Sequence, residues 1–348
     1  MRFAGIAWTD RGFDVALLAA DGTPAAPVEH FPAGAGRRLL EHQTALDRPE
    51  DPLVCVVEST NGMVDGGLMA AGLRVHRADP WNLPDRPGFG SVDAATLARA
   101  AVTGLPDLTR LVLEEGSLTG RGADHERGVR DGAPGLAALT AAGRCFSAGD
   151  RDGGGNGGQR IALTFDDGPN PPYTNRILDV LERYDVPATF FCVGLHASAH
   201  SEELARMAEA GHGFGNHTWS HPFLPDLSAR ELALQLERTD EAIAAGGGST
   251  KRRMFRPPYG SRSPEVLSWM NADDDHTVVL WDVDAEDWAM PGAATIARSV
   301  LDQSKPGSIV LLHDGGGDRS QTAEALPAVI EGLLERGYRF ALVDELLG

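Results

Sequence analysis

The chain has 348 residues, 42% of them hydrophobic, which is enough for about two packed domains. Its formal net charge is −19 at pH 7, and so acidic a surface repels phosphate backbones, which argues against a nucleic-acid partner. The three cysteines, Cys55, Cys145 and Cys192, lie far apart and indicate neither a disulfide framework nor a CxxC metal pair.

The stretch 1–18 carries charged residues where a signal peptide needs an apolar core, namely Asp10, Arg11 and Asp14. No apolar run elsewhere in the sequence approaches the length of a membrane span. We therefore expect a cytoplasmic protein without a membrane partner.

Residues 1–103 predict a small α/β domain. The segment 5–22 predicts a hairpin of two strands, 52–60 and 73–80 predict further strands, and 91–100 begins a helix. This order resembles the RNase H-like domain of DEDD-type insertion-sequence transposases. The resemblance implies four metal-binding acids.

Two of those four positions hold an acid in this sequence, Glu58 and Asp93. Ala7 and Thr96 stand at the other two, so a two-metal nuclease site is not expected. We expect an RNase H-like domain that is catalytically inactive and serves for packing or for binding a partner.

A glycine-rich polar stretch, GDRDGGGNGGQR at 149–160, separates the two halves of the chain. Such a sequence has high chain entropy and little to bury, so it predicts a flexible linker. We expect domains over 1–103 and 159–348, joined by a glycine-rich linker region over 104–158.

After the linker, short apolar runs alternate with amphipathic helical patterns. Strands are predicted within 160–165, 188–194, 213–217, 254–260, 277–283, 308–314 and 339–347, and helices within 175–184, 201–211, 228–245, 264–270, 295–303 and 325–337. Strands that alternate with helices form a parallel sheet covered by helices. So many units in one segment predict a closed or nearly closed (β/α) barrel.

Polar residues follow these predicted strands at the end where barrel enzymes keep their chemistry. They are Asp166 and Asp167 after IALTF, His217 after GFGN, Arg256 after MF, Asp284 and Asp287 after VVLW, and His313 after SIVLL. Their convergence on one rim predicts an active site there.

The stretch HTWSH places His217 and His221 four residues apart. On a helical turn both would reach one cation, although surface histidine pairs share this spacing. Asp166 and Asp167 have two possible interpretations. They begin a turn, or one of them binds the metal while the other acts as a base. Two imidazoles and one carboxylate would leave a metal with an open position, as in catalytic zinc sites.

Arg256 is expected to pair with Asp166, because a buried carboxylate needs a partner. His313 follows a buried strand and is either a catalytic residue or a histidine that only packs in the core. Asp287 is a candidate to orient the His313 ring. Tyr259 lies in a Pro-Pro turn whose backbone N–H groups can face a cavity.

Five motifs, TFDDGP, HTWSH, RPPYG, DAEDW and LLH, resemble in order and character those of the NodB-homology polysaccharide deacetylases, carbohydrate esterase family 4. The resemblance covers residues 158–348. It implies a NodB-like, distorted (β/α) barrel of seven to eight units. It also implies that Asp167, His217 and His221 bind a metal, usually Zn2+, with other divalent metals such as Co2+ as alternatives.

The same resemblance implies the remaining roles. Asp166 would be the catalytic base, and Arg256 would hold it ionised. His313 would be the catalytic acid, and Asp287 would tune its pKa. The backbone N–H of Tyr259 would donate a hydrogen bond to the oxyanion, and Trp288 and Leu311 would form the walls of the acetyl pocket. The expected activity is metal-dependent hydrolysis of N-acetyl groups from an amino-sugar polymer or oligomer. The alternatives are a nucleic-acid-binding or transposase-related protein, an amidohydrolase with a non-polysaccharide substrate, and a scaffold without activity.

Overall fold

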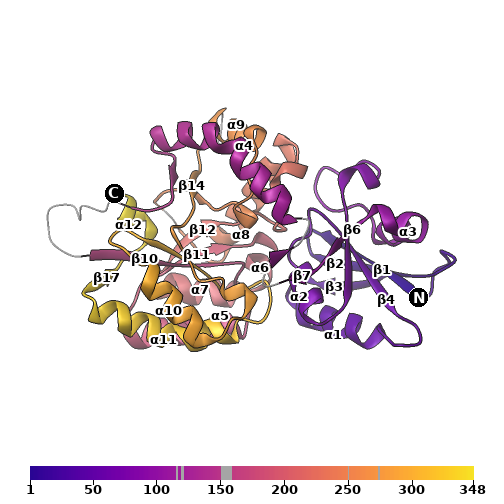
Figure 1. Ribbon diagram of the computed structural model, residues 1–348, viewed down its shortest axis with the longest axis horizontal. Helices are drawn as coiled ribbons and strands as arrows, with labels where there is room; N and C mark the ends of the chain where they lie inside the picture. The colour runs from indigo at the N-terminus through magenta and orange to yellow at the C-terminus, as the bar shows by residue number, and fades with distance from the viewer. Residues whose placement is uncertain (115–116, 119–120, 150–158, 250, 273–274) are drawn as a thin grey trace.

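The computed structural model describes residues 1–114, 117–118, 121–149, 159–249, 251–272 and 275–348. Figure 1 shows two α/β lobes side by side. We call the part built around β1–β6 the N-lobe and the part built around β9–β17 the barrel lobe. Among the described helices, none combines the length and the apolar composition needed to cross a lipid bilayer.

The N-lobe contains one sheet with the strand order β3-β2-β1-β4-β5-β6. Its strands are β1 (Arg2–Thr9), β2 (Gly12–Ala19), β3 (Glu29–Pro32), β4 (Leu53–Glu58), β5 (Arg74–Ala78) and β6 (Thr109–Leu111). β1 and β2 form the predicted antiparallel hairpin, and β4 and β5 run parallel to β1. The four predicted strands are therefore present, whereas β3 and β6 were not predicted from the sequence.

Helices cover both faces of the N-lobe sheet. They are α1 (Gly36–Leu46), α2 (Asp65–Ala70) and α3 (Ala94–Gly104), with short 3-10 turns η1 (Ala33–Ala35), η2 (Pro80–Asn82) and η3 (Leu105–Asp107). α3 packs against β1 so closely that a Cβ at Gly5 would lie 1.9 Å from the backbone oxygen of Ala94. Glycine is therefore required at that position of β1.

The barrel lobe contains a nine-stranded sheet with the order β15-β16-β10-β11-β12-β13-β14-β9, and β17 pairs with β10. The strands are β9 (Cys145–Phe146), β10 (Gln159–Asp166), β11 (Thr189–Cys192), β12 (Gly213–Asn216), β13 (Met254–Phe255), β14 (Thr277–Val279), β15 (Val283–Asp284), β16 (Ile309–His313) and β17 (Tyr338–Phe340). Their pairings are parallel. This confirms the predicted strands with two exceptions: the apolar run 277–283 divides into β14 and β15, and in the predicted stretch 339–347 the strand ends at Phe340 and a helix follows.

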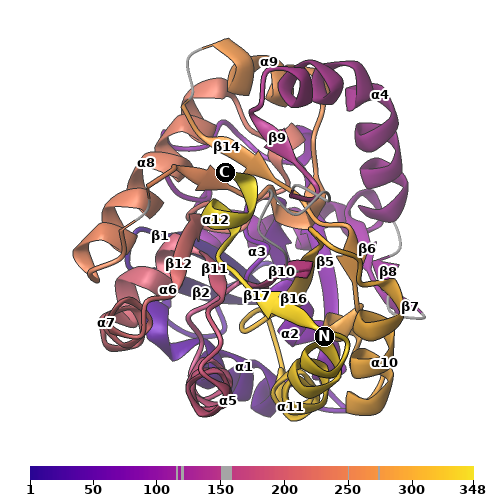
Figure 2. The ribbon, with the colours of Figure 1, turned by 90° about the vertical axis from the view of Figure 1, so that its left-hand side faces the viewer.

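Figure 2 shows the barrel-lobe strands curled inside a ring of helices. The helices are α4 (Arg121–Ala141), α5 (Tyr173–Tyr184), α6 (Gly194–Ala199), α7 (Ser201–Glu209), α8 (Ala229–Ala245), α9 (Pro264–Ala272), α10 (Ala293–Gln303), α11 (Ser320–Glu335) and α12 (Val343–Leu347). Short elements complete the chain: η4 (Leu224–Asp226), η5 (Pro258–Gly260), η6 (Asp287–Ala289), β7 (Leu113–Glu114) and β8 (Ser117–Leu118). Within the described residues no ladder joins β15 to β9, so the parallel sheet is a curled half-barrel rather than a closed one.

The region 104–158, predicted as a linker, contributes structure to both lobes. β6 pairs with β5 in the N-lobe, whereas β9 pairs with β14 in the barrel lobe. Leu139 and Cys145 are buried in the same apolar cluster as Phe255. The N-lobe thus extends beyond residue 103 and the barrel lobe begins before residue 159. The glycine-rich part of the predicted linker, 150–158, lies outside the described residues.

Candidate active site

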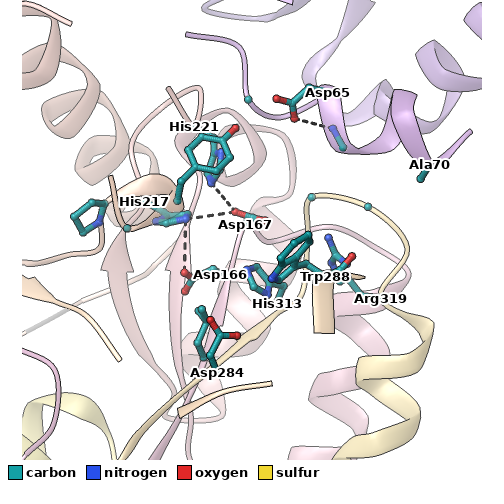
Figure 3. Close-up of a pocket in the computed structure, with 18 of the residues that line it drawn as sticks. Asp65, Ala70, Asp166, Asp167, His217, His221, Asp284, Trp288, His313 and Arg319 are labelled. Carbon is teal, nitrogen blue, oxygen red and sulfur yellow. Dashed lines mark hydrogen bonds and ion pairs between the residues drawn. The ribbon is translucent and has the colours of Figure 1, made fainter. Parts of the chain in front are cut away.

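The carboxyl ends of the parallel strands meet at one cavity of about 360 Å3. β10 ends at Asp166, β12 leads into His217, and β16 ends at His313; all three side chains line the cavity (Figure 3). We call this cavity the cleft. The predicted convergence of polar residues from separate strands is therefore present in the fold.

Asp167, His217 and His221 form a compact group of metal-binding side chains. Their ligand atoms all lie within 4.8 Å of one another. Oδ1 of Asp167 lies 3.4 Å from Nε2 of His217 and 3.2 Å from Nε2 of His221. One carboxylate oxygen and two imidazole nitrogens are a donor set that suits a divalent transition metal with an open position.

The two histidines do not share a helical turn, which corrects the expectation from their spacing. Residues 217–221 form a loop, here called the ligand loop, in which Thr218 and His221 adopt φ values of 67° and 53°. These left-handed residues turn the chain so that the two imidazole centroids lie 4.9 Å apart. The two imidazoles are therefore close together, as expected, but a loop brings them together and not the helical turn that the spacing suggested.

Hydrogen bonds orient the metal-binding side chains from behind. Nδ1 of His217 lies 2.7 Å from the backbone oxygen of Arg256, so Nδ1 carries the proton and Nε2 offers its lone pair to the cleft. Nδ1 of His196 makes a 2.7 Å hydrogen bond to the backbone oxygen of Asp167. Burial alone raises the pKa of Asp167, but His221 and His217 outweigh burial and hold that pKa well below its usual range. This carboxylate is thus ready to bind a cation.

Backbone strain is concentrated in this group. Asp167 has φ 75° and Tyr259 has φ 58°, in addition to the two left-handed residues of the ligand loop. Such conformations cost about 1–3 kcal/mol each and persist where the surrounding structure over-determines them. Under Asp167 the packing is tight, since a Cβ at Gly315 would lie 2.3 Å from the backbone oxygen of Asp167.

Arg256 lies behind Asp166 and is completely buried. Its Nη1 donates to Oδ1 of Asp166 at 2.7 Å and to Oγ1 of Thr164 at 2.8 Å, and its Nε and Nη2 donate to backbone oxygens of Val279 and Leu280. The guanidinium also stacks over the Phe191 ring, 4.1 Å from the centroid. A cation held this firmly fixes the orientation of the Asp166 carboxylate.

His313 and Asp287 form a second buried ion pair across the cleft. Nδ1 of His313 lies 2.7 Å from Oδ1 of Asp287, and Thr322 donates to Oδ2 of the same carboxylate. Burial raises the pKa of Asp287, but the facing His313 cation outweighs it and lowers that pKa. Nε2 of His313 is thereby left as the ring nitrogen that can face a substrate.

Tyr259, Asp284, Trp288 and Leu311 also line the cleft. The Tyr259 ring packs edge-on against His221, with 4.5 Å between centroids. The cleft also has lining residues that the sequence analysis did not identify, namely Gly62, Asp65, Gly66, Ala70, Met290 and Arg319. Four of these belong to the N-lobe, and a turn-like STNG stretch after a buried strand is the only sequence signal near them.

Comparison with known proteins points to one family. The family model for "Polysaccharide deacetylase" matches residues 153–275. The chain is 39% identical over 194 residues to a chitooligosaccharide deacetylase of Sinorhizobium fredii, which covers 53% of this chain and 90% of that protein. It is 41% identical over 186 residues to the peptidoglycan-N-acetylmuramic acid deacetylase PdaC of Bacillus subtilis, covering 53% of this chain but only 38% of that relative.

A solved structure agrees with these similarities. The crystal structure of a peptidoglycan N-acetylglucosamine deacetylase in complex with 4-naphthalen-1-yl-N-oxidanyl-benzamide superposes with a TM-score of 0.56 at 33% identity. The match covers 60% of this chain and 95% of that one.

Proposed function

The chain belongs to the polysaccharide deacetylase family, and on that premise we propose that it hydrolyses N-acetyl groups of an amino-sugar oligomer or polymer in a metal-dependent reaction. One observation carries this proposal. The Asp167–His217–His221 group shares the cleft with Asp166 and His313, each of which is oriented by a buried partner, Arg256 and Asp287 respectively. Such a site has a place for a metal, a base and an acid.

Asp167, His217 and His221 would hold the metal, and we infer Zn2+ because two imidazoles and one carboxylate are a common catalytic zinc set. Co2+ binds donors of the same kind and is expected to substitute. When bound, such an ion polarises the amide carbonyl and makes water easier to ionise at neutral pH.

The protein's own groups would move the protons. Asp166, held in place by Arg256, would take the proton of the attacking water. His313, whose Nδ1 is bound to Asp287, would give a proton from Nε2 to the departing amine. We infer that the Tyr259 N–H stabilises the negative oxygen of the tetrahedral state and that Trp288 and Leu311 enclose the acetyl methyl group.

A screen for released acetate tests this function. Zinc-loaded protein is expected to release acetate from N-acetylglucosamine oligomers or from peptidoglycan fragments, and acetylated xylan serves as the ester-containing comparison. Asp166→Asn is the matched inactive variant. Absence of acetate release from every N-acetylated glycan, with zinc bound, would reject the proposal.

For the N-lobe we infer an RNase H-like arrangement without nuclease activity. The strand order and the mixed directions of β3-β2-β1-β4-β5 support it. Glu58 is bound to Arg86 and to the backbone N–H of Val92, and Asp93 caps α3 by accepting from the Thr96 N–H. Because both acids have structural partners, the full chain is expected not to nick supercoiled DNA with added Mg2+; nicking abolished by Glu58→Gln would reject this inference.

A further inference from the structure

The ligand loop, residues 217–221, lies between the two lobes. Ser220 Oγ donates to the backbone oxygen of Thr60 at 2.7 Å, and the Gly62 N–H donates to the backbone oxygen of Ser220 at 3.3 Å. Just beyond the loop, the Phe223 N–H donates to the backbone oxygen of Ser59 at 3.0 Å. A segment of the N-lobe, residues 59–62, therefore runs along the loop that carries two metal-binding histidines.

The segment 59–62 is itself fixed within the N-lobe. Nδ2 of Asn61 donates to the backbone oxygen of Ile6 in β1, and Nε1 of Trp8 donates to Oγ1 of Thr60. Asn61 and Thr60 are almost completely buried. The segment 59–62 is thus bonded to β1 on one side and to the ligand loop on the other, so the N-lobe sheet fixes the position of the loop.

Trp219, between the two histidines, extends this attachment into an apolar core. Its side chain is only 6% exposed and belongs to the cluster that includes Trp8, Leu39 and Leu68 of the N-lobe. Its ring centroid lies 5.7 Å from that of Phe89. Burial of so large an aromatic side chain stabilises the contact, so the ligand loop is anchored to the N-lobe core.

Gly62 touches the site directly. A Cβ at this position would lie 2.1 Å from Oη of Tyr259, 2.2 Å from the backbone oxygen of His221 and 2.8 Å from Nδ1 of His221. Real Cβ atoms do not approach other atoms this closely, so any side chain at residue 62 must displace His221 or Tyr259. The position of one metal-binding imidazole therefore depends on an N-lobe glycine.

The N-lobe also forms one wall of the cleft. Gly62, Asp65, Gly66 and Ala70 line the cavity from that side, and Figure 3 shows Asp65 above the Asp167–His221 pair and Ala70 to the right of it. Opposite them lie residues that belong to the barrel lobe, namely Trp288, Met290, Gly316, Gly317, Asp318 and Arg319. The two walls meet where a Cβ at Gly66 would lie 3.4 Å from the backbone oxygen of Gly316.

We propose that the N-lobe is part of the active site, with residues 59–62 positioning the ligand loop and α2 serving as a specificity wall. The wall limits the cleft to about 360 Å3, at the lower end of the range for cavities that enclose a small ligand. An internal unit of a long glycan needs open space on both sides of the reacting sugar, and on one side α2 at Gly66 lies close to the backbone of Gly316. The substrate class is therefore a short N-acetylated saccharide or the end of a chain; this part rests on the proposed function.

The positioning role is tested by zinc affinity, which is independent of turnover. In the full chain, Gly62→Ala is expected to weaken zinc binding by about 10–100-fold in a chelator competition, the range for supports of metal ligands. Gly36→Ala is the matched control, because a Cβ there meets no described atom within 4 Å. If Gly62→Ala destabilises the fold, Ser220→Ala is expected to weaken zinc binding in the same direction; it removes the hydrogen bond to Thr60 together with the one that Ser220 Oγ accepts from Gln235. Wild-type zinc affinity in both variants would overturn the positioning role.

The specificity wall is tested by substrate length. Wild-type protein is expected to have a higher kcat/KM for di- to tetrasaccharides of N-acetylglucosamine than, per unit, for a long soluble glycan. Ala70→Trp, at an exposed position on the wall, is expected to raise KM severalfold with zinc affinity unchanged. Ala71→Trp is the control, since Ala71 is equally exposed and lies outside the described cleft lining. A preference of the wild type for the long glycan, or an unchanged KM in Ala70→Trp, would overturn the proposal that α2 limits substrate length. Absence of activity on every substrate would instead reject the proposed function.

Discussion

The carboxylate of Asp287 makes two hydrogen bonds to His313, one with its imidazole and one with its backbone N–H. Nδ1 of His313 lies 2.7 Å from Oδ1, and the backbone N–H of His313 donates to Oδ2 at 2.9 Å. Burial alone lowers the pKa of His313, but the charge of Asp287 and its hydrogen bond outweigh burial and raise that pKa to about 9. The protonated form, which a general acid needs, is therefore present at neutral pH and is lost as the pH rises through that value.

The first prediction concerns the alkaline limb of the pH–rate profile. In wild-type protein, kcat/KM is expected to fall as the pH rises through about 9, because His313 then loses its proton. Asp287→Asn removes the charge that raises this pKa, so the limb is expected to move to lower pH. Glu286→Gln, which changes an exposed neighbouring acid, is the control. If the alkaline limb of the Asp287→Asn profile lay at the same pH as in the wild type, Asp287 would not be the group that raises the pKa of His313.

The second prediction concerns metal content. Purified protein is expected to bind about one zinc ion per chain, as a single three-ligand catalytic site does. His221→Ala removes one of three donors and is expected to lose most of the metal in elemental analysis, whereas His30→Ala, at an exposed position, keeps it. Full retention by His221→Ala would exclude that imidazole from the site.

The third prediction separates the two adjacent aspartates. Asp166→Asn is expected to keep zinc and lose turnover by at least about 100-fold, because it removes a base and not a ligand. The amide can still accept from Arg256, so its cost in stability is expected to be below the roughly 3–5 kcal/mol of breaking a buried pair completely. Asp167→Asn is expected to weaken zinc binding. Near-normal rates in Asp166→Asn would contradict its role as base.

The sequence predicted which residues meet at the rim because the signal there is local. A buried apolar strand followed by Asp166 or by His313 identifies a strand end, and parallel strands bring their carboxyl ends to one side. The pairing of Asp166 with Arg256 also followed from the need of a buried carboxylate for a cation.

The contribution of the N-lobe was not predictable in this way. Contacts such as Thr60–Ser220 join segments far apart in the sequence, and no periodicity of either segment encodes them. The left-handed φ of His221 was likewise not predicted, since HTWSH contains no glycine or turn dipeptide that would indicate it. Glycine-rich composition set the stretch 149–160 apart in the sequence, but it gave no sign that Leu139 and Cys145 before it are buried against the barrel lobe.

The last prediction concerns the charged contact that holds the lobes together. Arg86 of the N-lobe donates to Glu58 at 3.0 Å, and across the interface to Glu231 at 3.1 Å and to the backbone oxygen of Asp226 at 2.7 Å. Glu58 is completely buried, and burial raises its pKa even with Arg86 present. Arg86→Met leaves this carboxylate without a cation, so the free energy of unfolding is expected to fall by about 3–5 kcal/mol.

The pH dependence identifies the cause of that loss. Without Arg86, the pKa of Glu58 in the folded state rises further above its value in the unfolded chain. The stability of Arg86→Met is therefore expected to be nearest to wild type in acid, where Glu58 is neutral, and to decline as the pH rises through the folded-state pKa. Chemical denaturation at several pH values measures this, and the double variant Glu58→Gln, Arg86→Met is expected to recover part of the loss and to show a flatter profile. A loss that is equal at every pH would assign the effect of Arg86 to packing and to the backbone of Asp226 rather than to the buried charge of Glu58.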